Sequence, residues 1–341
     1  MKRYDDFAQL DEDQLQKLCK RPAISFDTVT PIVAPLLDDV RRNGDNAVRR
    51  YEATFGNEYS DDFQVTEQEI DAACSRISEE VQRAFVQAAK NIEMFHKAQL
   101  KTETKVETMP GVTCFTEVRG IQKVGLYVPG GTAPLPSSLL MLAIPARLAG
   151  CKEIAVCTPS KDGAVADIVL YAARLCGVDK IFKIGGAQAV AAMAYGTETI
   201  PKVFKIFGPG NQYVTAAKML VSIDPDGAAI DMPAGPSEVL VIADEQARAD
   251  FVAADLLAQA EHGPDSQVVL VSASRTEIKE VLSELEKQLT SLPRKDIARQ
   301  AHVNSFALLV PSLAAAVDFS NRYAPEHLIL NTVMLKTYFL T

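Results

Sequence analysis

Short apolar segments alternate with helical stretches four times between residues 124 and 222, and a turn containing glycine separates each segment from its helix. The segments with strand character cover 124–128, 153–157, 180–184 and 203–207, and the helical stretches cover 136–148, 164–176, 188–195 and 211–222. Strands that alternate with helices in this way are typical of a parallel, doubly wound sheet with helices on both faces. The sequence therefore predicts an α/β fold.

The alternation resumes after a stretch rich in proline and glycine at 232–236. Strand character returns at 238–243, 267–271 and 306–310, and helical stretches begin at 246, 275 and 313. We therefore expect two Rossmann-like domains, each with a doubly wound parallel sheet, and a crossover between them at 232–236.

The first 105 residues are rich in charge and show helical periodicity, notably over 26–55 and 66–100. Thr66 and Glu69 have the spacing of a capping box at the start of the second stretch. We interpret the chain as an N-terminal helical arm (1–24), a first α/β domain (25–126 together with 237–330), a second α/β domain (127–236) and an atypical tail (331–341).

Composition excludes several classes of protein. The chain has 341 residues and a formal net charge of −9, so it offers no broad basic face to a nucleic acid. The N-terminus lacks the apolar core of a signal peptide, and no run approaches the roughly 18 apolar residues of a membrane span. We expect a cytoplasmic protein with no nucleic-acid or membrane partner.

Three loops with glycine follow predicted strands, at 129–132, 185–188 and 207–211. In such loops the backbone amides at a helix N-terminus can approach an anionic group. None of the three has the G-x-G-x-x-G pattern of dinucleotide-binding proteins. The loops alone therefore fit either a ligand site or tight turns that need glycine.

Gln259 and His262 lie near the end of an apolar helical stretch that begins at about Arg248 and stops at 263–264. A spacing of three places both side chains on one helical face, one turn apart. An amide oxygen and an imidazole nitrogen there could share a metal ion, although zinc needs at least four ligands. Glu261 and Asp265 are further candidates, and a solvated helix end is the alternative interpretation.

Glu326 and His327 follow Pro325 and precede the short apolar segment 328–330. Neighbouring side chains on a strand point to opposite sides, unless the proline makes the backbone irregular. A neutral histidine beside a glutamate can act as a general base, while the glutamate handles a proton of water. The alternative is a surface glutamate next to a half-buried histidine.

Taken together, five segments resemble the histidinol dehydrogenase family. They cover 124–135, 207–214, 231–239, 259–267 and 324–328, in that order along the chain. Enzymes of this family oxidise L-histidinol through the aldehyde to L-histidine, with two NAD and a bound zinc, in histidine biosynthesis. The resemblance implies the same activity, the same cofactors and a homodimer.

The resemblance also implies roles for individual residues. Gln259 and His262 match zinc ligands that also contact substrate, and Glu326 and His327 match the catalytic pair, in which His327 contacts substrate as well. The remaining matches are Tyr127, Gln188 and Asn211 for NAD and Ser237 for substrate. By this resemblance the first domain carries the zinc and catalytic residues, and the second carries the NAD-binding loops.

The segment 331–341 does not resemble the family's continuation, which supplies two further zinc ligands, an aspartate and a histidine. We therefore expect a truncated chain with impaired catalysis and a weakened homodimer. Two alternatives remain open on these grounds. One is a related zinc and NAD dehydrogenase of another small polar alcohol, and the other is a non-catalytic remnant.

Overall fold

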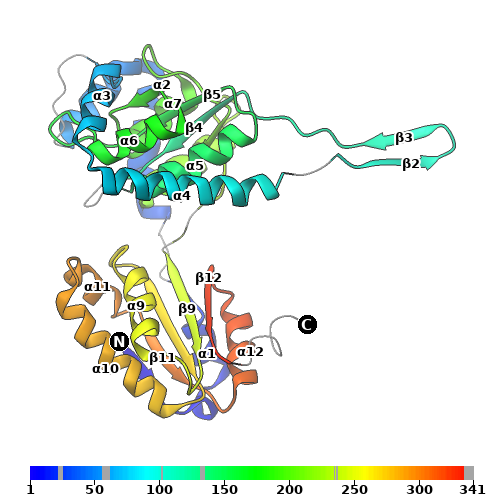
Figure 1. Cartoon of the computed structure of the whole chain (residues 1–341), viewed down its shortest axis with the longest axis vertical. Coiled ribbons are helices and arrows are strands. Elements are labelled where there is room, and N and C mark those ends of the chain that lie inside the picture. The colour runs from blue at the N-terminus through cyan, green and yellow to red at the C-terminus, as the bar shows by residue number, and fades with distance from the viewer. Residues whose placement is uncertain are drawn as a thin grey trace. The chain divides into compact units, whose positions relative to one another are not determined.

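The computed structural model describes residues 1–21, 26–55, 62–100, 103–130, 135–233, 235 and 237–333 (Figure 1). The chain forms two compact units. One unit consists of Met1–Ile24 with Gly235–Thr341, and the other of Ser25–Ala234. We call them the split unit and the continuous unit.

The continuous unit contains a parallel sheet of five strands in the order β6-β5-β4-β7-β8. The strands are β4 (Lys123–Tyr127), β5 (Glu153–Cys157), β6 (Lys180–Phe182), β7 (Lys205–Phe207) and β8 (Ala229–Ile230). From β4 the chain first winds outward through β5 and β6, and then returns to β7 on the other side of β4. This reversal is the switch point of a doubly wound sheet, as the alternation predicts.

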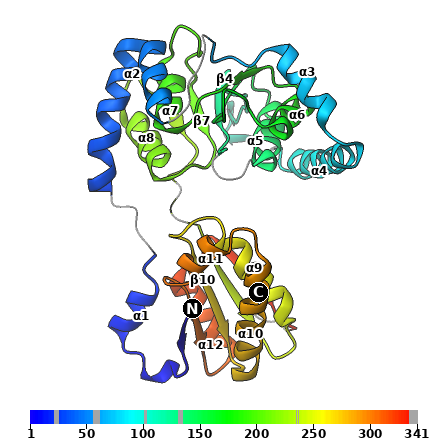
Figure 2. The same ribbon diagram turned by 90° about the vertical axis from the view of Figure 1, so that its left-hand side faces the viewer.

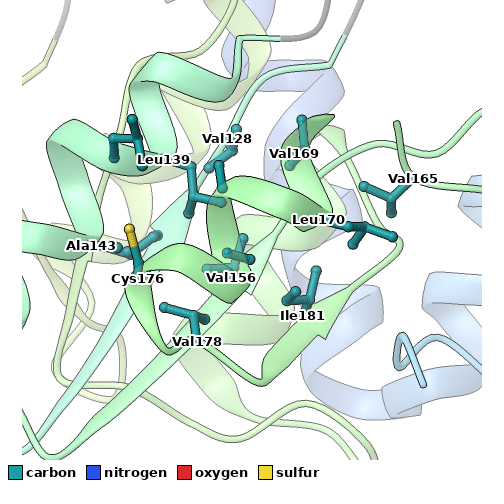
Figure 3. Close-up of a cluster of buried hydrophobic side chains, with 14 of the residues drawn as sticks. Val128, Leu139, Ala143, Val156, Val165, Val169, Leu170, Cys176, Val178 and Ile181 are labelled. Atoms are coloured by element: carbon teal, nitrogen blue, oxygen red, sulfur yellow. The ribbon is translucent and has the colours of Figure 1, made fainter. Parts of the chain in front are cut away.

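Helices cover both faces of this sheet, which confirms the predicted α/β class (Figure 2). The connecting helices are α5 (Pro136–Leu148), α6 (Asp167–Cys176), α7 (Gly186–Tyr195) and α8 (Gln212–Ile223). Figure 3 shows the core that α5 and α6 form with β4, β5 and β6, where valine and leucine side chains from strands and helices interlock. Val156 and Ile181 in the strands and Leu139 in α5 are fully buried there.

The predicted division into domains is wrong for residues 25–126. Three helices of this region are α2 (Phe26–Thr54), α3 (Glu67–Arg76) and α4 (Glu79–Ala98), and they pack on the continuous unit's own helices. α2 contacts α7 and α8, α3 contacts α6, and α4 contacts α5. Val65, Ile70 and Ala73 belong to the same buried cluster as the strands β4 and β5. The apolar faces of these helices thus pack against the helices of the second predicted domain.

A hairpin in the same region has no counterpart in the sequence prediction. β2 (Lys105–Met109) pairs antiparallel with β3 (Val112–Phe115), and every residue of both strands is exposed. Figure 1 shows the hairpin extending away from the sheet of the continuous unit. Helical periodicity dominates the surrounding sequence, so a short exposed pair of strands was missed.

The split unit also has a parallel five-stranded sheet, in the order β1-β11-β10-β9-β12. Its strands are β1 (Lys2–Tyr4), β9 (Glu238–Ala243), β10 (Gln267–Ser272), β11 (Phe306–Leu309) and β12 (His327–Asn331). Its helices are α1 (Glu12–Leu18), α9 (Ala249–Ala260), α10 (Arg275–Ser291), α11 (Lys295–Ala301) and α12 (Leu313–Tyr323), with a 3-10 turn at Phe7–Gln9. Alternate strand residues face α9, α10 and α11 on one side, and α12 and α1 on the other.

Both ends of the chain differ from the sequence prediction. The segment 1–24 is not purely helical, because β1 joins the sheet beside β11 and Tyr4 packs edge-to-face on Phe306 with ring centroids 5.9 Å apart. The tail was predicted from 331, but Asn331 still belongs to β12. Residues 22–24, 234, 236 and 334–341 of the predicted arm, crossover and tail lie outside the described residues.

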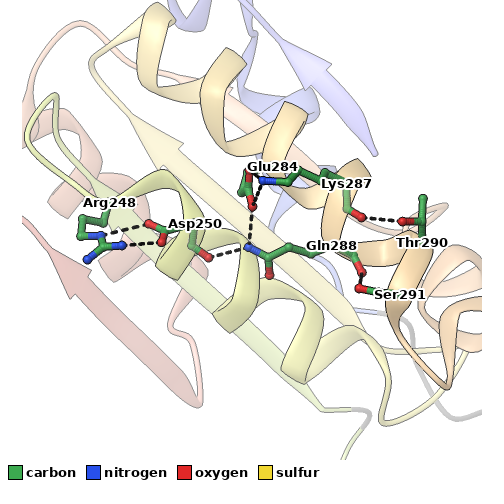
Figure 4. A network of polar contacts seen from close by, with 7 residues as sticks. All are labelled: Arg248, Asp250, Glu284, Lys287, Gln288, Thr290 and Ser291. Carbon is green, nitrogen blue, oxygen red and sulfur yellow. Dashed lines mark hydrogen bonds and ion pairs between the residues drawn. The ribbon is translucent and has the colours of Figure 1, made fainter.

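Polar contacts fix α9 against α10 (Figure 4). Nε2 of Gln288 on α10 donates to the carbonyl oxygen of Asp250 at 2.9 Å and to Oε1 of Glu284 at 3.1 Å. Arg248 donates to the carboxylate of Asp250 in the first turn of α9, a position where negative charge suits the helix dipole. The bond from Gln288 to Asp250 thus joins the first turn of α9 to α10. No helix in the described ranges is both long and apolar enough to cross a membrane.

Candidate active site

A cavity of about 430 Å³ lies in the split unit between the last turns of α9 and the start of β12. Its polar lining consists of Asp255, Gln259, His262, Glu326 and His327. Four of these five are candidates from the sequence, and they come from two segments more than sixty residues apart. The fold therefore brings the two predicted pairs together in one pocket.

The end of α9 positions Gln259 and His262. The helix ends at Ala260, slightly before the predicted end, and the backbone N–H of His262 donates to the carbonyl oxygen of Gln259 at 3.3 Å. This last turn keeps both side chains on the pocket side of the helix. The other two candidates, Glu261 and Asp265, do not line the pocket.

An irregular turn brings Glu326 to the same pocket as His327. Ala324, which ends α12, has a φ of +51°, and Pro325 separates it from β12. β12 begins only at His327, which pairs with Val239 of β9. Glu326 therefore lies in the turn and escapes the strict alternation of a strand. The structure thus has the irregular backbone that was expected next to Pro325, at Ala324 and Glu326.

Hydrogen bonds to Glu238 at the start of β9 hold the catalytic candidates. The backbone N–H of Glu326 donates to Oε1 of Glu238 at 2.6 Å. Nδ1 of His327 lies 3.0 Å from the carbonyl oxygen of Glu238. A carbonyl oxygen can only accept, so this bond places a proton on Nδ1 and leaves Nε2 as the basic nitrogen of the neutral ring.

Asp255 is a pocket residue that the sequence analysis missed. It precedes Gln259 by four and His262 by seven residues, and this spacing on one helical face is the signal that could have found it. Burial raises the pKa of its carboxyl group. Within the described residues no hydrogen bond or ion pair to Asp255 is present, so the pocket contains a carboxylate that is free to meet a cationic group.

The donor set in this pocket fits part of a zinc site. Gln259 offers an amide oxygen and His262 an imidazole nitrogen, both of which zinc accepts. Across the described ranges no group of three or more histidine, cysteine, aspartate or glutamate side chains could hold a metal ion. Within the described ranges, Gln259 and His262 thus offer two donors of types that zinc accepts, whereas a zinc site needs about four ligands.

The three residues matched to NAD contacts lie in the continuous unit. Tyr127 ends β4, and Asn211 follows β7, the neighbouring strand at the switch point of the sheet. Gln188 lies in the first turn of α7. Ligands of open α/β sheets bind beyond the carboxyl ends of strands at such a point. Of the predicted loops, 131 and 132 lie outside the described residues.

Close backbone contacts shape this switch point. Gly208 has a φ of +120°, and a Cβ atom there would lie 2.1 Å from the carbonyl oxygen of Tyr127, so only glycine permits the approach. The backbone N–H of Gly186 donates to the hydroxyl oxygen of Tyr127 at 3.1 Å. Burial raises the pKa of Tyr127 to about 12, so its hydroxyl stays protonated at neutral pH.

Gln188 and Asn211 are held differently. Gln188 is buried, and its Nε2 donates to Oε1 of Glu52 at 2.8 Å, while its own Oε1 has no hydrogen-bond partner in the described part of the chain. The exposed Asn211 caps α8, where its Oδ1 accepts the backbone N–H groups of Tyr213 and Val214. Glu52, a fully buried carboxylate on α2, is a second residue that sequence reasoning missed.

Ser237, matched to a substrate contact, immediately precedes β9. Its carbonyl oxygen accepts the backbone N–H of Gln267 at 3.2 Å. Ser237 is not among the residues that line the pocket. Its proposed contact with substrate therefore stays a prediction.

Comparisons with known proteins identify the family. The family model for histidinol dehydrogenase matches residues 19–340. The chain is 51% identical to the histidinol dehydrogenase of Pectobacterium atrosepticum over 328 residues, which are 96% of this chain and 74% of that protein. It is 53% identical to that of Bacteroides thetaiotaomicron over 322 residues, covering 94% of this chain and 75% of the relative.

A solved structure agrees with these relatives. The crystal structure of histidinol dehydrogenase from Elizabethkingia anophelis matches with a TM-score of 0.94 at 46% identity, over 99% of this chain and 77% of that one. This likeness confirms the α/β fold with its parallel sheets. The chain therefore belongs to the histidinol dehydrogenase family of oxidoreductases.

Proposed function

We propose that this chain oxidises L-histidinol to L-histidine through L-histidinal, with NAD as the hydride acceptor. The observation that carries the proposal is the meeting of Glu326 and His327 with Gln259 and His262 in one pocket. Family membership supports the same reaction. The pocket also contains the carboxylates of Asp255 and Glu326, which suit a substrate that carries a positive charge.

His327 would act as the general base of the first oxidation. Its neutral ring has Nε2 available because Nδ1 carries the proton shared with the carbonyl oxygen of Glu238. Nε2 accepts the hydroxyl proton of the alcohol while hydride passes from the alcohol carbon to NAD. The products are the aldehyde, NADH and one proton.

Glu326 would act in the second oxidation. Its carboxylate removes a proton from water, and the water oxygen attacks the aldehyde carbon to give a hydrated aldehyde. His327 then accepts a hydroxyl proton of the hydrate as the second hydride leaves to a second NAD. The sum of both steps is one carboxylate, two NADH and three protons from one alcohol, one water and two NAD.

Gln259 and His262 would hold the zinc ion through the amide oxygen and an imidazole nitrogen. When bound, zinc supplies a template that fixes the polar groups of the substrate. The two side chains lie about one helical turn apart at the C-terminal end of α9, where they line the pocket.

NAD would bind at the switch point of the continuous unit. Tyr127, Gln188 and Asn211 lie at or after strand ends there, beside the N-termini of α7 and α8. The positive end of the helix dipole at an N-terminus favours an anionic group such as the pyrophosphate of a dinucleotide. The glycines at 185–186 and at 208 permit this approach of the backbone.

A homodimer is the proposed assembly, and the cytoplasm the proposed location. The hairpin β2–β3 exposes Val106, Met109, Val112 and Phe115, and α4 has no buried residue. Several large apolar side chains exposed on one hairpin are typical of a surface that another chain covers. We propose that a second copy covers this hairpin.

The test is NADH formation by the purified full chain with zinc present. L-histidinol is expected to yield two NADH per molecule, and L-histidinal one. Glu326→Gln should slow the aldehyde step more than the alcohol step, whereas His327→Gln should slow both by about 100-fold or more. Neutral polyols of similar size serve as control substrates. Turnover of a polyol without turnover of L-histidinol would overturn the proposal.

A further inference from the structure

Glu238 is a buried carboxylate beside the catalytic pair. It is the first residue of β9 and is 2% exposed. A carboxylate buried to this degree is costly unless it is paired with a cation and hydrogen bonded. Its Oε1 lies 3.1 Å from Nη2 of Arg21 and accepts the backbone N–H of Glu326 at 2.6 Å. Glu238 therefore links the N-terminal segment to the turn that carries Glu326.

Arg21 holds the same turn through further contacts. Its Nη2 donates to the carbonyl oxygen of Tyr323 at 3.2 Å and to that of Ala324, and its guanidinium lies 5.0 Å from the centre of the Tyr323 ring. The planar fork of arginine suits such simultaneous donation and stacking. Ala324 has a φ of +51°, a conformation that costs a non-glycine residue about 1 kcal/mol or more. The contacts of Arg21 offset this strain immediately before Glu326.

His327 depends on the same residue through its backbone. Nδ1 of His327 donates to the carbonyl oxygen of Glu238 at 3.0 Å, and His327 pairs in register with Val239, the next residue of β9. A shift of the turn before β12 moves the ring away from this carbonyl. The ring would then lose the preference for a proton on Nδ1.

We infer that Arg21 and Glu238 are positioning residues for the catalytic pair: they fix the turn that brings Glu326 to the pocket and keep Nε2 of His327 as its basic nitrogen. Neither Arg21 nor Glu238 lines the pocket, so both act through the turn. The inference rests on the acid–base roles proposed above for Glu326 and His327.

The first test reads the tautomer of His327 directly. The chain has four histidines, so long-range ¹H–¹⁵N spectra of histidine-labelled protein can be assigned with His327→Gln. With a chelator present and above the histidine pKa, the wild type is expected to show a proton on Nδ1 of His327. Glu238→Ala and Arg21→Ala are expected to move the proton to Nε2 or to give a mixture. Arg21 is partly exposed, so its variant offers a readout even if Glu238→Ala fails to fold.

Conservative and control variants separate positioning from a general loss of structure. Glu238→Gln keeps an oxygen for the N–H of Glu326 and for Arg21, so the wild-type tautomer is expected to persist. Arg322→Ala removes an arginine of α12 whose ion pair with Glu12 lies at the surface, and it is expected to leave both the tautomer and turnover unchanged. Melting curves check that each variant folds cooperatively.

The second test is turnover of L-histidinol. Glu238→Ala and Arg21→Ala are expected to lower kcat about 10- to 100-fold with little change in the KM for NAD, and Glu238→Gln to recover most of this loss. A proton on Nε2 of His327 in the wild type, or an unchanged tautomer in both alanine variants, would overturn the inference. A wild type with the expected tautomer but no turnover would count against the proposed function alone.

Discussion

The side-chain amide of Gln188 donates to Oε1 of Glu52 at 2.8 Å inside the continuous unit. Because a carboxylate only accepts, this bond turns the NH₂ group of Gln188 toward Glu52 and its carbonyl oxygen away. The same carboxylate oxygen accepts the backbone N–H of Gly185 at 3.1 Å. One buried acid thus fixes both a side chain and a backbone amide at the start of α7.

Replacement of Glu52 by alanine is expected to weaken NAD binding and to lower stability. The donors of Gly185 and Gln188 would lose this acceptor while they remain buried, at a cost of about 1–3 kcal/mol each. Urea denaturation measures the stability, and calorimetric titration with NAD is expected to show a Kd raised about tenfold. Glu93→Ala, at an exposed ion pair on α4, is the control. A loss of stability with an unchanged Kd would show that Glu52 does not position Gln188 for NAD.

Metal binding should depend on the last turn of α9. Gln259→Ala and His262→Ala each remove one donor from the proposed zinc site. Loss of even a side chain that only orients a metal ligand lowers metal affinity about 10- to 100-fold, so loss of a ligand should lower zinc affinity at least as much. Competition with a chromophoric chelator measures the zinc affinity, and dialysis against a chelator should abolish turnover of L-histidinol in the wild type. Glu261→Gln is the matched control, since Glu261 does not line the pocket. Equal zinc affinity in all three variants would refute the site.

His302 should make the protein less stable in mild acid. Burial lowers the pKa of this histidine, and its Nε2 has no hydrogen-bond partner in the described part of the chain. The unfolded chain therefore binds its proton first as the pH falls below about 6.5. Stability is full above that pH and falls as the pH drops toward the lowered pKa, by at most about 1.4 kcal/mol per pH unit.

The measurement is the unfolding free energy from about one pH unit above to about 1.5 units below the ordinary histidine pKa. His302→Gln removes the titrating group and is expected to flatten the curve. His96→Gln, on the last turn of α4, should leave the curve as it is. If His302→Gln shows the same dependence of unfolding free energy on pH as the wild type, groups other than His302 cause the acid sensitivity.

The exposed hairpin should govern self-association. Met109 is 61% exposed and Phe115 is 67% exposed, and each is a large apolar side chain. If a second copy covers them, Met109→Ser and Phe115→Ser should each raise the dimer dissociation constant about tenfold or more. Light scattering over a dilution series measures this, with Thr113→Ser as the control. Dimers of unchanged affinity would place the interface elsewhere.

The sequence predicted where the strands and helices lie along the chain more reliably than which of them pack against one another. Periodicity reports which residues of an element are apolar, so β4 to β7 and β9 to β11 were expected where they occur. It does not report which apolar face covers which, and α2, α3 and α4 were therefore assigned to the wrong unit. β1 was missed because three residues carry too little pattern to mark a strand.

The sequence predicted two separate pairs of site residues, and only the fold shows that both pairs lie in one pocket. A spacing of three marks Gln259 and His262 as neighbours, but nothing in a spacing relates them to His327. Glu52 and Glu238 were missed because isolated acidic residues are common on surfaces, and only burial distinguishes these two. Asp255 was missed although its spacing to Gln259 and His262 places it on the same helical face. The roles of Glu52 and Glu238 follow from hydrogen bonds that cross from one element to another.

β12, which begins at His327, the proposed general base, pairs with β9 and with no other strand in the described ranges. A strand held on one side opens locally at lower free energy than the central strands β9 and β10. Backbone amides of β12 (327–331) should therefore exchange with solvent faster than those of β9, β10 and β11; β1, the opposite edge strand, is left out of this comparison. On heating, His327 would lose its hydrogen bond to Glu238 while the rest of the unit stays folded. The enzyme is expected to lose activity below its melting temperature, and to recover it on cooling.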